Sequence, residues 1–394
     1  MLKRFWLLIP VLVVFALLAT TTVNAEIPTR KIVVFKAGFD TAMKDAAVRE
    51  VGGRQLKSLK QVNAVAAELT PASVSALVAR GNVLRVADDG IAREHAIEPP
   101  AGETGIRNNL IDRGFNRDRG EQLPWGIRRI RAPESWKVST GKGIKVAVLD
   151  SGIDLSHPDI HVAGGVCEVD GVESYDDDRG HGTHVAGIIA ALDNSYGVAG
   201  VGPDIQLYAV KVLDKTGAGW WSDIFAGLDW CVDHGMQVAN MSFGSSQYDE
   251  TYAEVIYQTY KAGVLLVASA GNNGPTPDSV HYPAKYPGVL AVSAIDSNDK
   301  IASWSSIGPD VDLAAPGVDI YSTYTKPKYA TMSGTSAAAP HVAGVAALRM
   351  KVDRDRSPDH IADVLKRNAS KLPGLTPDQQ GAGLVDAYRV VNAR

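Results

Sequence analysis

Residues 334–344, Gly-Thr-Ser-Ala-Ala-Ala-Pro-His-Val-Ala-Gly, constrain this chain most, because they place a serine among small residues at the start of an apolar helix. The small neighbours of Ser336 leave room for another chain to approach its hydroxyl. The N-terminus of a helix also directs free N–H groups and the positive end of its dipole at an anion formed there. Ser336 is therefore a candidate nucleophile. The alternative is a serine that only caps a buried helix, which is a common arrangement.

Two upstream segments supply the partners that such a serine needs. Residues 145–154 form a short apolar run that ends in Asp150 and a glycine turn, which predicts a buried parallel strand with Asp150 at its carboxyl end. Open α/β sheets place their active sites at that edge. Residues 181–190 begin a second apolar helix with His181 at its tip. The chain order is therefore Asp150, His181, Ser336.

These three segments resemble those of the subtilisin-like serine proteases, the subtilases, whose triad runs in this order. The resemblance extends from about residue 124 to residue 391. It implies a doubly wound, mostly parallel α/β sheet flanked by helices, and a serine endopeptidase that works through an acyl-enzyme. His181 would accept the serine proton and return it to the leaving amine, while Asp150 would fix the imidazole tautomer. The nearby Asp154, His157 and His184 are expected to be structural.

A further match concerns the oxyanion site. Residues 264–268 predict a buried strand, and residues 269–274 after it resemble the family segment whose first asparagine donates its side-chain amide to the tetrahedral oxyanion. Here that residue is Asn272. The Asn-Asn-Gly composition alone would also fit a simple turn. The backbone N–H of Ser336 is the expected second donor.

We expect the substrate to bind as an added β-strand. Such binding uses main-chain hydrogen bonds and therefore tolerates many sequences. The resemblance places Ser242, Phe243 and Gly244 on one flank, Gly217, Ala218 and Gly219 on the other, Ser269, Ala270 and Gly271 around the primary specificity pocket, and Trp221 and Ile224 with Phe243 in an outer pocket. Asn273 and His281 match the rim of the primary pocket and carry no fixed charge at neutral pH. This predicts a preference for large apolar or aromatic residues before the cut bond. The alternative for Trp221 is an ordinary core aromatic.

Calcium is the cofactor that the resemblance implies, in a structural role. Residues 192–198 resemble the family's calcium loop, and Ca²⁺ requires hard oxygen donors. The expected ligands are the side chains of Glu121, Asp159 and Asn194 and the carbonyl oxygens of Leu192, Tyr196 and Val198. The alternative is a polar surface turn. A weaker cation site would involve Asp312 and the carbonyl groups around Ala284 and Tyr286.

Composition and the N-terminus predict an exported protein of more than one domain. The chain has 394 residues, of which 45% are apolar and 21% charged, enough to bury a large core. Residues 1–25 carry Lys3 and Arg4, an apolar run and a small-residue cleavage site, which is typical of a signal peptide. A retained membrane anchor is the alternative. We expect a secreted monomer that acts on protein or peptide substrates, with no nucleic-acid partner and no membrane partner once the signal peptide is removed.

Residues 31–97 predict a separate small domain with the β-α-β-β-α-β order of a ferredoxin-like fold. This unit resembles the subtilase propeptide, which implies an intramolecular chaperone and temporary inhibitor. It is net positive, whereas residues 121–394, the expected catalytic domain, are net negative, so the two are electrostatically compatible. Residues 98–120 read as a linker. The family's processing junction falls within residues 94–97.

Three questions stay open at the level of sequence. Cys167 and Cys231 could form one disulfide or remain two unpaired buried thiols. The chain could also be a non-catalytic relative that only binds peptides, although all four catalytic positions are filled. It could also be a selective processing protease, although the matching pocket segments contain no acidic cluster.

Overall fold

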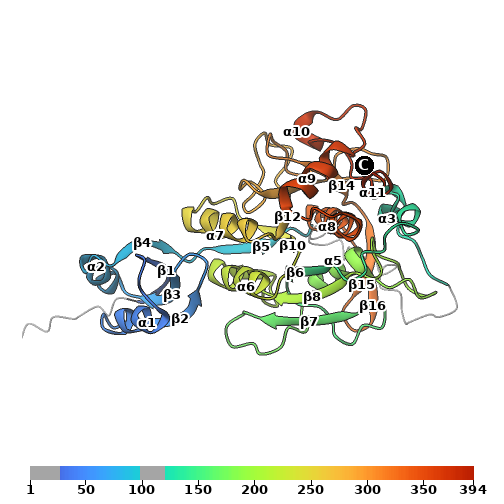
Figure 1. Cartoon of the computed structure of the whole chain (residues 1–394). Coiled ribbons are helices and arrows are strands. Elements are labelled where there is room, and N and C mark those ends of the chain that lie inside the picture. The colour runs from blue at the N-terminus through green and yellow to red at the C-terminus, as the bar shows by residue number, and fades with distance from the viewer. Residues whose placement is uncertain (1–26, 98–119) are drawn as a thin grey trace, which may run out of the picture.

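The computed structural model describes residues 27–97 and 120–394. The predicted signal peptide (1–25) and all but the last residue of the predicted linker (98–120) lie outside the described residues. A small α+β unit is followed by a larger α/β unit, and strand β5 (Ile91–Glu94) leaves the first to lie on the second (Figure 1). Within the described ranges, no helix has the length and apolar character needed to cross a membrane.

The small unit has the element order that the sequence predicts. Its elements are β1 (Thr29–Phe35), α1 (Thr41–Arg49), β2 (Arg54–Leu59), β3 (Ala64–Leu69), α2 (Pro71–Ala79) and β4 (Val83–Asp88). The strands form one antiparallel sheet in the order β2-β3-β1-β4. Both helices begin at capping side chains, since Asp40 accepts from the N–H of Met43 and Thr70 from that of Ser73.

The larger unit is built on a seven-stranded sheet in the order β14-β13-β12-β10-β6-β8-β7, and all of its pairings are parallel. The strands are β6 (Lys145–Asp150), β7 (Val162–Cys167), β8 (Gln206–Lys211), β10 (Val238–Met241), β12 (Leu265–Ser269), β13 (Val289–Ile295) and β14 (Leu313–Pro316). This confirms the predicted fold class. In β6, Val146 and Val148 enter one apolar cluster, whereas Ala147 and Leu149 enter another. Burial on both faces explains why these strands are apolar without alternation.

Helices cover the two faces of this sheet (Figure 1). α5 (His181–Ala190) and α8 (Thr335–Val352) pack on one face, and α6 (Trp221–Asp233) and α7 (Glu250–Lys261) on the other. The remaining elements are α3 (Trp125–Arg129), α4 (Ala132–Ser135), β9 (Ala218–Trp220), β11 (Phe243–Gly244), β15 (Ile320–Tyr324), β16 (Lys328–Met332), α9 (Pro358–Arg367), α10 (Pro377–Gln380) and α11 (Ala387–Val391).

The small sheet packs against α6 and α7. Ile32 and Val34 of β1 belong to the same apolar cluster as Phe225 of α6 and Val255 of α7. Around this contact the charges are opposite in sign, as the sequence suggested: Nζ of Lys57 lies 3.4 Å from a carboxylate oxygen of Asp223. The small unit is therefore held against the large one by apolar burial with matched charges at its rim.

The two cysteines are unpaired. Cys167 at the end of β7 is partly exposed, and Cys231 in α6 is fully buried. Of the two alternatives left open by the sequence, the structure therefore supports two free thiols, although only Cys231 is buried as expected. Burial raises the pKa of the Cys231 thiol, so this cysteine is an inert core residue.

Candidate active site

Asp150 and His181 meet at the carboxyl edge of the sheet. Asp150 is the last residue of β6 and His181 the first of α5, and Nδ1 of the imidazole lies 2.8 Å and 3.0 Å from the two carboxylate oxygens. The N–H of Ser151 donates to the same carboxylate at 2.7 Å. Asp177 fixes the start of α5 by accepting from the N–H groups of Gly180 and Thr183. Both partners of the pair are thus held by local structure.

The carboxylates around His181 favour its protonated form. Burial lowers the pKa of His181, but the carboxylates of Asp150 and Glu94 outweigh that effect and raise it to about 9. Within the described residues, Nε2 of the ring is buried and has no hydrogen-bond partner. The nitrogen that would exchange a proton with a nucleophile is therefore not occupied by another group.

Ser336 is the second residue of α8. The N-cap of this helix is Gly334, with no side-chain cap hydrogen bond, so the alternative of a capping serine does not hold. Gly334 is needed as glycine, since a Cβ there would lie 2.2 Å from the carbonyl oxygen of His95. The N–H of Ser336 points at that same oxygen at 3.4 Å. The start of α8 thus faces a backbone carbonyl group.

Asn272 donates to the same carbonyl oxygen. Its Nδ2 lies 2.7 Å from the oxygen of His95. Its Oδ1 accepts from the N–H of Thr335 at 3.0 Å and from the hydroxyl of Thr335 at 2.9 Å, which turns the amide nitrogen toward the carbonyl. Sequence reasoning missed this role of Thr335, although its position directly before Ser336 is a usable signal. Two donors converge on one carbonyl oxygen, which is the geometry of an oxyanion site.

The carbonyl belongs to the chain's own segment, which lies in the groove as an added strand. β5 pairs antiparallel with β9 on one side and with β11 on the other. The expected flanks are therefore the ones that β5 contacts, and the N–H of His95 continues the ladder by donating to the carbonyl of Ser242 at 3.1 Å. The peptide bond from His95 to Ala96 is the one presented to Ser336.

The side chains of this segment fill two pockets. The imidazole of His95 bonds Ser269 and His281, beside the expected Ala270 and Gly271. Three residues earlier, Ala92 is fully buried in the apolar cluster that contains Trp221, Ile224 and Phe243. The N–H of Trp221 donates to the carbonyl of Gly90 at 2.8 Å. The primary and outer pockets are thus both occupied by the chain itself.

An ion pair beside the groove was not expected from the sequence. Glu94 pairs with Arg179 at 2.5 Å, and its other carboxylate oxygen lies 3.9 Å from Nδ1 of His181. Burial acts to raise the pKa of Glu94. His181 and Arg179 together have the larger effect and lower this pKa below its usual value. Glu94 is therefore an anion placed next to the histidine. No local motif marks this contact, because the partners are distant in sequence.

The residues expected to be structural have structural contacts. Nε2 of His184 lies 2.9 Å from the carbonyl of Ile320, and burial lowers the pKa of this ring to about 3. Nε2 of His157 lies 2.9 Å from the carbonyl of Lys328. Asp154 accepts from the N–H groups of Ser156 and Lys326. None of these groups faces the His95 carbonyl in the contacts that the described residues make.

The expected calcium loop brings two carboxylates and an amide together. Asn194 donates from Nδ2 to Asp159 at 2.8 Å, and the carboxylate of Glu121 accepts from the N–H of Asn194 at 2.7 Å. Burial, followed by the charge of Glu121, raises the pKa of Asp159 to about 7 against the hydrogen bonds it accepts. No ion pair within the described ranges compensates these carboxylates. The side chains fit a hard cation, although Asn194 would first have to turn its amide oxygen inward.

The loop is not a cluster of acidic ligands. Among the described residues, no group of three or more His, Cys, Asp or Glu side chains could hold a metal ion. Any calcium ion there would depend on the amide of Asn194 and on the carbonyl oxygens of Leu192, Tyr196 and Val198. This is compatible with the varied oxygen ligands that Ca²⁺ accepts.

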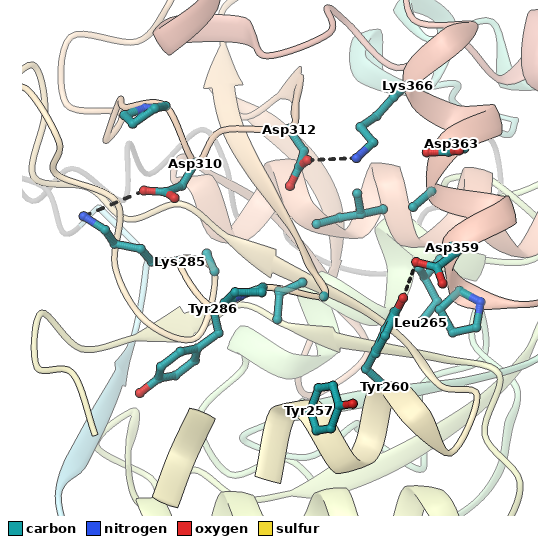
Figure 2. A pocket seen from close by; sticks show the side chains of 18 residues that line it. Tyr257, Tyr260, Leu265, Lys285, Tyr286, Asp310, Asp312, Asp359, Asp363 and Lys366 are labelled. Carbon is teal, nitrogen blue, oxygen red and sulfur yellow. Dashed lines mark hydrogen bonds and ion pairs between the residues drawn. The ribbon is translucent and has the colours of Figure 1, made fainter. Parts of the chain in front are cut away.

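The expected weaker cation site lies in a cleft of about 460 Å³ (Figure 2). Asp312, Ala284 and Tyr286 line this cleft together, as predicted. However, one oxygen of Asp312 lies 3.4 Å from Nζ of Lys366, and the other accepts from the N–H of Ala291 at 3.0 Å. A carboxylate that already faces an ammonium group and a backbone donor is a poor metal ligand. These residues therefore do not fit a bound metal ion.

Comparisons with known proteins agree with this geometry. A family model described as the subtilase family matches residues 141–383. Subtilisin E of Bacillus subtilis (strain 168) is 40% identical over 348 residues, covering 86% of this chain and 85% of its own. Subtilisin Savinase of Lederbergia lenta is 47% identical over 268 residues, covering 68% and 98%. A thermostable alkaline protease of Halalkalibacterium halodurans is 45% identical over 270 residues, covering 68% and 73%.

Proposed function

The chain belongs to the subtilase family and is a serine endopeptidase, and on that premise we propose that Ser336, His181, Asp150 and Asn272 carry the reaction. The observation that carries this proposal is the carbonyl of His95, whose oxygen receives donors from both Asn272 and Ser336. That carbonyl belongs to the bond that the chain would cut first.

On this proposal the reaction would run as follows. The hydroxyl oxygen of Ser336 attacks the carbonyl carbon, and its proton passes to Nε2 of His181. The negative charge that forms on the carbonyl oxygen is stabilised by Asn272 and the N–H of Ser336. His181 gives the proton to the leaving amine, the C–N bond breaks, and an acyl-enzyme remains. Water attacks the acyl-enzyme by the same route. Asp150 holds the imidazole in the required tautomer throughout.

Specificity is broad because most of the binding is made by backbone. β5 is held on both edges by main-chain pairing, which any extended peptide can reproduce. The side chain of His95 enters the primary pocket around Ser269, Ala270 and Gly271, and that of Ala92 enters the outer pocket around Trp221. Apolar and aromatic groups are favoured there because the pockets contain no fixed charge.

We infer that residues 31–97 are the propeptide region and that its processing junction, expected within residues 94–97, is the bond after His95. Its strand β5 blocks the groove in the way a substrate would bind, so after the cut it would remain as an inhibitor until released. The matched charges at the interface, Lys57 with Asp223 among them, support this role. Residues 1–25 would direct export, so the enzyme acts outside the cell as a monomer.

We also propose a structural calcium ion at the loop of residues 192–198. The buried, uncompensated carboxylate of Asp159 and its neighbour Glu121 supply the negative charge that would hold the ion. The ion would tie the segment around Glu121 to the body of the enzyme. It takes no part in the chemistry, since its proposed ligands are not the residues that face His95.

Active-site titration with a fluorophosphonate tests the enzyme against a protein that only binds peptides. The processed protein should be labelled once, on Ser336, in parallel with the loss of peptide hydrolysis. Asp154→Asn serves as a matched control, because it changes a structural carboxylate near the site and should still be labelled. Labelling elsewhere, or hydrolysis that survives full labelling of Ser336, would contradict the proposed function.

A further inference from the structure

The primary pocket holds the side chain of His95 by two hydrogen bonds. Nδ1 of His95 lies 2.7 Å from the hydroxyl oxygen of Ser269, and Nε2 lies 3.0 Å from Nδ1 of His281. The two rings meet edge-on with centroids 4.9 Å apart. His95 and Ser269 are buried, and His281 is half-buried. Every polar atom of the His95 ring therefore has a partner in the pocket wall.

A neutral imidazole is the group that satisfies this wall. It carries one donor and one acceptor, Ser269 can play either role, and His281 can take the tautomer that complements the ring. Burial and the neighbouring histidines hold the pKa of His95 well below its usual value, so the ring is neutral in the pocket. A phenyl ring of similar size would leave the hydroxyl of Ser269 and Nδ1 of His281 without these partners, which costs free energy.

The surrounding backbone leaves room for both rings. A Cβ at Gly244 would lie 2.6 Å from Cε1 of His95, and one at Gly271 would lie 3.0 Å from Cγ of His281. His281 is fixed in turn by its backbone N–H, which donates to the carbonyl of Ala270 at 2.8 Å. Its outer side borders a cleft of about 400 Å³. The pocket thus has a fixed, polar end instead of an apolar one.

Resting on the proposed peptidase function, we propose that His281, together with Ser269, makes the primary pocket select histidine before the cut bond. The substrates favoured by this enzyme are then polypeptides with a neutral histidine at that position. For the primary pocket this narrows the expected preference for apolar or aromatic groups to histidine, because imidazole is an aromatic ring that also forms hydrogen bonds. His281 is the specificity-determining residue, and the enzyme's own junction at His95 is the first example of its substrate.

The test compares peptides built on residues 91–97, Ile-Ala-Arg-Glu-X-Ala-Ile, with X as histidine, phenylalanine or alanine. The enzyme is the processed protein, its active fraction counted with a fluorophosphonate. The specificity constant for histidine should exceed that for phenylalanine by about 10-fold, the effect of leaving buried partners unpaired. In His281→Ala, which leaves the contact with Ser269 in place, the ratio should fall from about 10-fold to about three-fold. His161→Ala, at an exposed histidine, is the matched control and should keep the wild-type ratio.

Two results would overturn the inference: phenylalanine cleaved as well as histidine by the wild-type enzyme, or an unchanged ratio in His281→Ala. If His281→Ala fails to fold, the specificity constant of the wild-type enzyme is measured instead on a peptide whose histidine is methylated on Nε2. That peptide should fall to the phenylalanine level, and cleavage at the histidine level would refute the role of His281. A protein that neither cleaves any of these peptides nor reacts with fluorophosphonate would instead remove the premise, the proposed function itself.

Discussion

At the scale of single residues, the feature that most affects chemistry is the pair of carboxylates beside His181. On the proposed function Asp150 would stay with the processed enzyme, whereas Glu94 would leave with the propeptide. Glu94 raises the pKa of His181 by its charge, so the histidine is more easily protonated while β5 is in place. Glu94 is therefore an anion that opposes the loss of a proton from His181, the proposed general base.

The first prediction concerns the pH dependence of self-cleavage. His181 can act as a base only when unprotonated, and its pKa is raised to about 9 with β5 bound. The single-turnover rate of cleavage at His95 should therefore increase as the pH rises toward 9. Glu94→Gln removes one of the two anions and should move the midpoint to lower pH. The measurement is the rate of precursor loss between about pH 6 and 10.

Glu50→Gln is the matched control for this experiment, because it changes an exposed glutamate of the same unit that pairs with Arg80. Its midpoint should equal that of the wild type. Coincident profiles for Glu94→Gln and the wild type would mean that Glu94 does not set the protonation of His181.

At the scale of elements, the segment that contains β5 binds the groove through its backbone and places side chains in the two pockets. The outer pocket is where an element of the enzyme contributes most, since Trp221 begins α6 and is almost completely buried. Gly90 lies against its indole so closely that a Cβ would approach to 2.4 Å. Ala92 lies in the same apolar cluster, and its side chain is only a methyl group.

The second prediction is that Trp221 selects large residues four positions before the cut bond. Burying one aromatic group contributes on the order of 1.5–3 kcal/mol. In Trp221→Ala, the specificity constant should fall by roughly 10- to 150-fold on a peptide with phenylalanine at that position, and little on one with alanine. The two peptides differ only there. Trp230→Ala, on the same helix and stacked on His234, is the control. Equal losses on both peptides would make Trp221 an ordinary core residue.

Much of the element structure could be predicted because its signals are local. The apolar run that ends in Asp150 is β6, the small-residue segments at His181 and Ser336 begin α5 and α8, and the order of the small unit follows from periodicity and caps. Each signal depends on neighbours within a few residues. The family resemblance then supplied roles that no local pattern contains, such as that of Asn272.

The contacts that sequence analysis missed join residues far apart in the chain. Glu94 with Arg179 and His95 with His281 are separated by 85 and 186 positions, so neither leaves a local pattern. Lys366 beside Asp312 belongs to the same class, and it replaces the weaker cation site that the resemblance suggested. The unpaired state of Cys167 and Cys231 likewise depends on distances that only the folded chain sets.

At the scale of the whole molecule, the proposed calcium ion would act on stability more than on catalysis. The third prediction is that EGTA lowers the thermal midpoint of the processed enzyme, because the ion binds only the folded state. At a free calcium concentration of about 1,000 times Kd the ion stabilises by about 4 kcal/mol, or roughly 8–16 °C in a domain of this size. The kcat at low temperature should change much less.

Asp159→Asn is the matched variant for the chelation experiment. Its melt should be the same with and without calcium, and similar to that of the wild type in EGTA. An unchanged wild-type midpoint in a preparation shown to have lost its metal would exclude this site.

The central claim is that the chain cuts itself after His95 with Ser336. Residues 26–394 would be refolded with other proteases excluded, and the products read by intact-mass and N-terminal analysis. The wild-type chain should yield a new N-terminus at Ala96, and Ser336→Ala should stay whole although it folds, as its circular dichroism would show. A Ser336→Ala chain cut at the same bond, or a wild-type chain cut at another one first, would contradict the account.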